Sequence, residues 1–156
     1  MENLLQIPSE EAQIRIQKIQ ELLIAQGIDA LLISDNANKF YISGRVYNGY
    51  TYISANGNVI HFIRRPVDLI GDNLVYIHKP ENINEILVER GYSLPNTIAL
   101  ELDITPYSTI QRLSKVFPNA QIANASGILR QVRSIKTDYE LSLLKLSGEK
   151  HAKAYS

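Results

Sequence analysis

Residues 50–64 read YTYISANGNVIHFIR, two alternating segments on either side of Asn56-Gly57. Asn-Gly between alternating segments is the strongest short-range signal for a β-hairpin closed by a type I′ turn. The pattern predicts antiparallel strands over 50–55 and 58–64, and Pro66 is expected to end the second strand. Because a two-residue turn joins only antiparallel strands, a sheet that contains this hairpin is mixed and not wholly parallel.

Helices and strands alternate on both sides of the hairpin. Apolar residues recur every three or four positions in four segments, which predicts amphipathic helices. Short apolar runs between them are typical of strands buried on both faces of an α/β sheet. We expect helices over 9–26, 82–90 and 106–117 and from 126 onward, and strands over 29–34, 74–78, 97–102 and, at an edge, 120–122. This order predicts a layered α/β domain with a mixed sheet.

Small polar residues precede most of the predicted helices, where their oxygens can accept hydrogen bonds from free N–H groups. Near the end of the chain, Thr137 and Glu140 have the spacing of a capping box, and Leu141 and Leu144 continue a helical stripe behind it. Gly27 and Gly91 are expected to end helices. The other predicted N-caps are Ser9, Asn82 (with Glu85), Thr105 (before Pro106) and Ser126.

The composition of the 156 residues is that of an ordinary globular protein, with 45% hydrophobic and 21% charged residues. Sixteen basic residues balance sixteen acidic ones, which is not the basic balance typical of nucleic-acid binders. Without cysteine the chain has no disulfide or thiolate chemistry. It shows no signal peptide and no apolar run of membrane-spanning length. We therefore expect a cytoplasmic protein without nucleic-acid or membrane partners.

Few residues have the spacing of a catalytic or metal site. His61, His78 and His151 pair with no second ligand at helical spacing, so structural or surface roles are expected for them. Glu101 and Asp103 lie two positions apart at the exit of a strand, where open α/β sheets bind ligands. They form either a cation-holding pair or, as we favour without a third ligand, one turn acid and one surface acid.

Aromatic and cationic residues gather around Gly44. Arg45, Tyr47 and Tyr50 are the candidates for an interface or a substrate cleft, because interfaces are enriched in Arg and Tyr. The alternative is ordinary packing in the core, which is the favoured role for Tyr41. Tyr50 and Tyr52 are two positions apart and are expected to share one face of a strand.

Four segments, taken in order, resemble one known family. They are Arg15 and Leu22 followed by GIDALLIS over 27–34, then Asn38-x-x-Tyr41-Ile42-Ser43-Gly44, then IALE over 98–101, and last Arg133-x-Ile135-Lys136-Thr137-x-x-Glu140-Leu141. Over roughly residues 12–154 the chain is similar to the creatinase/prolidase N-terminal domain. The last segment resembles the one that leads into the catalytic "pita-bread" domain of Xaa-Pro peptidases, the proline dipeptidase and aminopeptidase P family.

The resemblance implies a three-layer α/β/α fold with a mixed sheet. It implies that residues 1–134 form the N-terminal domain and 135–156 the junction and first helix of a truncated catalytic domain. In such enzymes two Asp, one His and two Glu bind two divalent ions (Mn, Co or Zn), and all five ligands lie in the catalytic domain. We therefore expect no catalytic, cofactor or metal residue in this chain, and no activity of the chain alone.

The resemblance also implies partners: a homo-oligomer, usually a dimer, and proline-containing peptides as substrate of the parent enzyme. Two alternatives remain open. The chain is an interaction module of a catalytically dead relative, such as a histone-chaperone subunit, or the N-terminal domain of a creatinase-like amidinohydrolase. Two departures bear on substrate preference: Arg45 stands where the family commonly has an aromatic residue, and the segment 64–73 is short.

Overall fold

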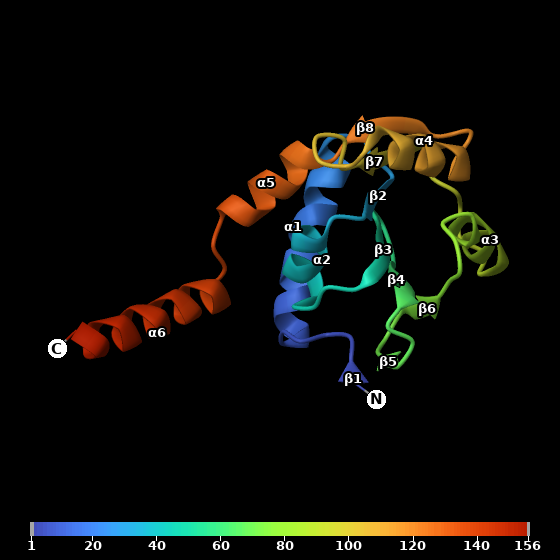
Figure 1. Cartoon of the computed structure of the whole chain (residues 1–156). Helices are drawn as coiled ribbons and strands as arrows, with labels where there is room; N and C mark the ends of the chain where they lie inside the picture. The colour runs from blue at the N-terminus through green and yellow to red at the C-terminus, as the bar shows by residue number, and fades with distance from the viewer. Residues whose placement is uncertain (1, 156) are drawn as a thin grey trace.

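The computed structural model describes residues 2–155, with side chains described over residues 2–148 (Figure 1). The main sheet consists of β2 (Ala30–Ile33), β3 (Asn48–Ser54), β4 (Val59–Arg65), β6 (Leu74–Tyr76), β7 (Thr97–Leu100) and β8 (Gln121–Asn124). The helices are α1 (Ser9–Ala25), α2 (Asn36–Ser43), α3 (Asn82–Glu89), α4 (Tyr107–Val116), α5 (Ser126–Ser134) and α6 (Asp138–Tyr155). Two short strands, β1 (Glu2–Asn3) and β5 (Leu69–Ile70), pair beside the main sheet.

The strand order is β6-β4-β3-β2-β7-β8. Strand β3 runs antiparallel to both of its neighbours, whereas the other neighbouring pairs are parallel. The sheet is therefore mixed, as the hairpin predicted, and β8 lies at an edge, as expected. The carboxyl ends of β2, β4 and β7 consequently meet at one edge of the sheet, together with the start of β3.

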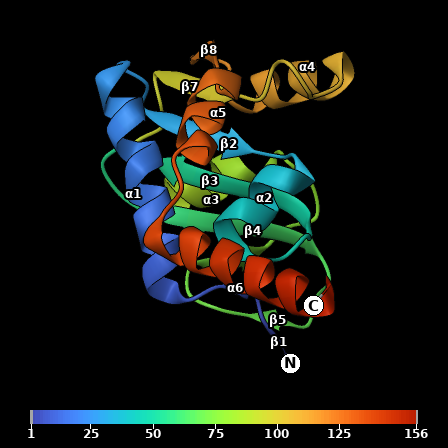
Figure 2. The ribbon, with the colours of Figure 1, turned by 90° about the vertical axis from the view of Figure 1, so that its left-hand side faces the viewer.

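Two apolar cores enclose the sheet and make the fold a three-layer α/β/α sandwich. Leu31 and Ile33 of β2 pack with α1, α2 and α5 on one face, while Ala30 and Leu32 pack with α3 and α4 on the other. All four of these β2 side chains are fully buried, which explains the continuous apolar run of this strand. Figure 2 shows α1, α2 and α5 in front of the strands and α3 behind them.

The β3–β4 hairpin is confirmed, but its predicted turn type is wrong. The last residues that pair across the hairpin are Ile53 and Val59, and β3 ends at Ser54, so four residues, 55–58, connect the two strands. Neither Asn56 nor Gly57 has the positive φ that a type I′ turn requires at both central positions. The side chain of Gln20 on α1 donates to the carbonyl oxygens of Ser54 (2.9 Å) and Gly57 (3.0 Å). These contacts from α1 hold the longer connection.

Several predicted N-caps are also wrong. Ser9 and Ser126 are the first residues of α1 and α5, whose N-cap positions are occupied by Pro8 and Ala125. In α4 the N-cap is Pro106, so Thr105 lies one position before it. Asn82 instead accepts hydrogen bonds from the N–H groups of the preceding turn, His78 and Lys79, so its predicted capping box is absent. Gly27 and Gly91, at φ +69° and +76°, end their helices as predicted.

Two aromatic side chains of the helices point outward. Phe40 of α2 and Tyr107 of α4 are 56% and 74% exposed. In α2 the inward positions are Asn38, Tyr41 and Ile42, with spacings of three and four, and this phase places Phe40 on the outer side.

The capping box that opens α6 is present on its N–H side: the Glu140 N–H donates to Thr137 Oγ1 over 3.1 Å. From this point α6 extends away from the rest of the fold (Figure 1). Four of its leucines, at positions 141, 143, 144 and 146, are about half exposed. None of the helices in the described residues has the length and apolar character needed to cross a membrane.

Candidate functional site

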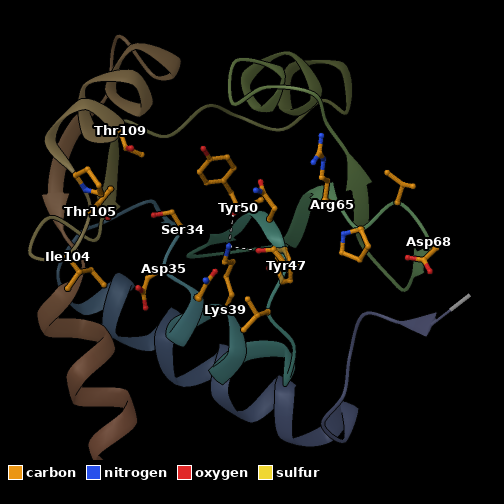
Figure 3. A pocket seen from close by; sticks show the side chains of 17 residues that line it. Ser34, Asp35, Lys39, Tyr47, Tyr50, Arg65, Asp68, Ile104, Thr105 and Thr109 are labelled. Atoms are coloured by element: carbon orange, nitrogen blue, oxygen red, sulfur yellow. Dashed lines mark hydrogen bonds between the residues drawn. The ribbon is translucent and has the colours of Figure 1, made fainter.

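A cleft of about 1070 Å³ opens at the edge of the sheet where β2, β4 and β7 end and β3 begins. In Figure 3 its lining residues come from the segment after β2, from α2, from the start of β3, and from the segments after β4 and β7. Open α/β sheets bind ligands at this edge, because the loops that follow adjacent parallel strands diverge there. The cleft is therefore the candidate functional site.

Lys39 of α2 forms the floor of the cleft (Figure 3). Its side chain is buried, and Nζ donates to the carbonyl oxygens of Tyr47 (2.6 Å) and Gly49 (3.2 Å). Nζ also lies 5.0 Å from the centre of the Tyr47 ring, within the range of a cation–π contact. Burial lowers the pKa of Lys39, although the nearby charges of Glu101 and Asp35 oppose that shift. Lys39 thus ties α2 to the first residues of β3, which form one wall.

The same wall passes unusually close to β4. Gly49 has φ +151°, and a Cβ atom at this position would lie 2.0 Å from the carbonyl oxygen of Phe62. The strand register also shifts between Asn48 and Gly49. Only glycine fits this approach, so the backbone of the wall is set by sterics as well as by Lys39.

The cleft is lined by exposed apolar side chains together with polar and charged groups. Val46, Val67 and Ile104 are each more than half exposed. Polar and charged side chains also line the cleft, among them Ser34, Tyr50 and the exposed Arg65 and Asp68 (Figure 3). Exposed apolar side chains next to groups of both charges suit a small zwitterionic or peptide-like molecule better than a simple anion or cation.

Glu101 supports the cleft from behind. It is 1% exposed, and its Oε1 accepts hydrogen bonds from Ser34 N (2.6 Å), Ser34 Oγ (3.0 Å) and Asp35 N (3.0 Å). Its Oε2 accepts from Asn38 Nδ2 over 2.6 Å. Glu101 therefore holds the segment between β2 and α2. The sequence-based preference for turn and surface acids was wrong for this residue, because a strand end in the middle of the sheet lies deep in the fold.

Asp103 does not join Glu101. It is exposed and contacts Arg130 (3.7 Å) and Asn124 (3.0 Å) instead. Within the described side chains, no group of three or more His, Asp or Glu residues is placed to hold a metal ion.

The three candidates Arg45, Tyr47 and Tyr50 have different positions. Tyr47 and Tyr50 line the cleft, where Tyr50 is half-buried and Tyr47 only 3% exposed. Arg45 lies outside the cleft, pairs with Glu2 (3.1 Å) and donates to the carbonyl oxygen of Asn3 (3.2 Å). Their role at an interface or substrate cleft stays a prediction.

The histidines have structural or surface positions where their side chains are described. His61 is 7% exposed, its Nδ1 contacts the hydroxyls of Thr51 and Tyr47, and burial lowers its pKa to about 4. Burial likewise raises the pKa of Tyr47 above its usual range. His78 is exposed, and the side chain of His151 lies outside the described residues.

Lys39 was missed by sequence reasoning because a lysine is usually a surface residue. The signal that could have found it is helical phase: Lys39 lies next to Asn38 on the inward side of α2, with Tyr41 and Ile42 continuing that side. A buried lysine needs acceptors, and the start of β3 supplies them.

The sequence profile of the creatinase/prolidase N-terminal domain matches residues 15–135. The chain belongs to this family. Its mixed sheet between helical layers is the fold that the family implies. All residues that line the cleft lie within the matched range.

Two curated relatives match most of the chain. The ectoine hydrolase of Halomonas elongata is 25% identical over 169 residues, which covers 90% of this chain and 41% of that protein. The uncharacterized hydrolase/peptidase y4tM of Sinorhizobium fredii is 23% identical over 166 residues, which covers 88% of this chain and 42% of that protein. The chain thus spans about two fifths of the length of these curated relatives.

Solved structures share the fold of this family domain. The Xaa-Pro dipeptidase of Bacillus anthracis aligns with a TM-score of 0.68 at 18% identity, over 93% of this chain and 44% of that one. The prolidase of Pyrococcus horikoshii OT3 aligns with a TM-score of 0.65 at 22% identity, over 91% of this chain and 41% of that one. The N-terminal domain of the cytoplasmic peptidase PepQ of Mycobacterium tuberculosis H37Rv aligns with a TM-score of 0.62 at 21% identity, over 76% of this chain and 98% of that one.

Proposed function

We propose that this domain is the non-catalytic N-terminal part of a cytoplasmic dinuclear-metal hydrolase that acts on Xaa-Pro peptides. The cleft formed by Lys39, Tyr47 and Tyr50 carries the proposal, because it lies at the ligand-binding edge of the sheet and has fixed walls. In this function the domain shapes one side of the substrate site. The hydrolytic step belongs to a catalytic domain with two divalent ions (Mn, Co or Zn).

The chemistry of the cleft supports a peptide-like substrate. A short Xaa-Pro peptide has an apolar ring, a free amine and a carboxylate at neutral pH. The lining of the cleft supplies exposed Val and Ile side chains together with Pro66 and Pro106, and Arg65 and Asp68 supply one charge of each sign. Each part of such a peptide therefore meets a complementary surface.

Helix α6 supports a contact with a further domain. Its leucines at 141, 143, 144 and 146 are about half exposed, and an apolar helix surface of this kind needs a partner in water. We assign this surface to packing inside the catalytic domain, of which α6 is the first helix. We assign Arg45, at the N-terminal strand, to the contact with a second copy in a homodimer.

One comparison favours a second candidate. The ectoine hydrolase relative matches 90% of this chain, so a small C–N substrate other than a peptide is the alternative. Ectoine and creatine are the two probes of that class. Both are compact zwitterions and would use the same mixed charges of the cleft.

A substrate panel on the intact gene product tests the proposal. The protein is loaded in turn with Mn²⁺, Co²⁺ or Zn²⁺ and given Ala-Pro, Ala-Pro-Ala, ectoine and creatine, with Ala-Ala as the matched peptide control. We expect metal-dependent hydrolysis of the proline peptides and no hydrolysis of Ala-Ala. Turnover of ectoine or creatine alone would establish the second candidate. If no probe is turned over, the proposal of an enzyme is contradicted, and the protein is better described as an interaction module.

A further inference from the structure

A second hollow, of about 450 Å³, lies on the α1 side of the sheet. The N-terminal segment, the first half of α1, the end of α2, β4 and the turn at 71–73 surround it. Its walls include the apolar side chains of Leu4, Ala12, Ile16 and Ile42, and the side chain of His61 also lines it. Polar residues, among them Asn3, Ser9 and Asn73, complete the lining.

The hydrogen bonds of His61 determine what its ring offers to the hollow. The Tyr47 hydroxyl contacts Thr51 Oγ1 closely, and Thr51 Oγ1 lies 3.1 Å from His61 Nδ1. Tyr47 is buried, so its hydroxyl hydrogen needs an acceptor within this group. Donation from Tyr47 to Thr51 and from Thr51 to Nδ1 satisfies both hydroxyls. Nδ1 is then an acceptor, and the ring hydrogen of the neutral imidazole is on Nε2.

The Nε2–H group makes no hydrogen bond within the described residues, and His61, although only 7% exposed, lines the hollow with this ring. A molecule in the hollow that supplies an acceptor therefore gains a hydrogen bond at this position. The mouth of the hollow carries the exposed Gln13 and Asp72. The carboxylate of Asp72 disfavours anions there.

We propose that this hollow binds a small uncharged molecule with a branched apolar body and a carbonyl oxygen, which accepts the hydrogen bond of His61 Nε2–H. The aliphatic walls contact the body, and Gln13 borders the entrance. The site is separate from the cleft, but Tyr47 connects the two, since it lines the cleft and its hydroxyl orients His61 through Thr51. The inference does not depend on the hydrolase function.

Isovaleramide is the probe, because it joins a branched body to an uncharged carbonyl group. In the intact protein labelled with ¹⁵N-histidine, we expect the His61 ring to show the Nε2–H tautomer before any probe is added. Isovaleramide should then shift the His61 signals with a dissociation constant on the order of 1 mM, as suits so few non-hydrogen atoms. Isovalerate, with the same body and a charge, should bind at least several-fold more weakly.

Two exposed glutamines of α1 provide matched variants. Gln13 borders the hollow and Gln17 does not, so Gln13→Trp should abolish the isovaleramide shift and Gln17→Trp should leave it unchanged. The Nδ1–H tautomer, no saturable shift with the amide, preferential binding of isovalerate, or equal binding by both variants would each overturn the proposal. The tautomer measurement needs no variant and so does not depend on either variant folding.

Discussion

Thr137 donates its hydroxyl hydrogen to Glu11 over 2.7 Å, although 126 positions separate the two residues. The same Glu11 carboxylate accepts from Arg15 Nε at 2.9 Å, and Arg15 also donates to the carbonyl oxygen of Tyr41. Thr137, Glu11 and Arg15 are all less than 9% exposed. The start of α6 is therefore fixed to α1 and, through Arg15, to α2.

Thr137→Val should lower the free energy of unfolding by about 1–3 kcal/mol, because it removes both an N-cap acceptor and the donor to a buried carboxylate. Urea unfolding measures the change. Thr105→Val is the matched control: Thr105 was predicted to cap α4, but Pro106 takes that position, so the loss should stay below about 0.5 kcal/mol. Equal losses in the two variants would contradict the buried role of Thr137.

Glu101→Gln should lower the free energy of unfolding by about 1.5–3 kcal/mol, since an amide NH₂ would replace one oxygen of a carboxylate that faces only donors. The same chemical change at Glu21, an exposed residue of α1, should be nearly silent. Thermal and urea unfolding of the two variants measure the difference. A silent Glu101→Gln would mean that the segment after β2 does not depend on this carboxylate.

Lys39→Met should destabilise the start of β3 by about 1–3 kcal/mol, because the carbonyl oxygens of Tyr47 and Gly49 lose a buried donor. Amide hydrogen exchange should rise over residues 47–50 more than over β7. Lys115→Met, at an exposed position of α4, is the control and should leave exchange at β3 unchanged. Unchanged protection of 47–50 in Lys39→Met would contradict the assigned role of Lys39.

His61 predicts a pH dependence of stability. Its pKa is lowered by burial to about 4 in the folded chain, whereas an unfolded histidine titrates near its usual 6.5. Between these values the unfolded chain binds the proton and the folded chain does not, so stability is full above about pH 6.5 and falls as the pH drops toward 4. The loss attributable to His61 should approach roughly 3 kcal/mol.

The measurement is a comparison of variants, because carboxylates titrate in the same range. The free energy of unfolding of His61→Gln should fall less steeply between pH 6.5 and 4 than that of the unmodified chain. His78→Gln removes an exposed histidine and should keep the original slope. A His61→Gln slope identical to that of the unmodified chain would show that His61 titrates normally in the fold.

The mixed sheet, the edge position of β8 and the order of the elements other than α2, β1 and β5 could be predicted from the sequence, because periodicity and the Asn56-Gly57 signal are local. The turn type could not, since Gln20 of α1 binds the connection from a distant part of the chain. The caps at Ser9 and Thr105 failed because an adjacent proline takes the N-cap position. Local propensity places a helix start only to within one or two residues.

The candidate site was predicted only in part. Tyr47 and Tyr50 do line the cleft, whereas Arg45 lies beside β1. Glu101 and Lys39 gain their importance from partners on other elements, such as Ser34 and Gly49, and such contacts leave no periodic signal in the sequence. Buried polar groups are therefore the residues for which the fold has to be known first.

The central claim, that the cleft forms one side of the substrate site, is tested most directly by kinetics of Tyr50→Phe in the intact gene product. Tyr50 lines the cleft, and Tyr92, which packs on the core outside the cleft, supplies the control Tyr92→Phe. With Ala-Pro as substrate, kcat/KM of Tyr50→Phe should fall about tenfold, the equivalent of one hydrogen bond of about 1.4 kcal/mol, while Tyr92→Phe stays unchanged. Equal kcat/KM for Tyr50→Phe, Tyr92→Phe and the unmodified protein would contradict the claim.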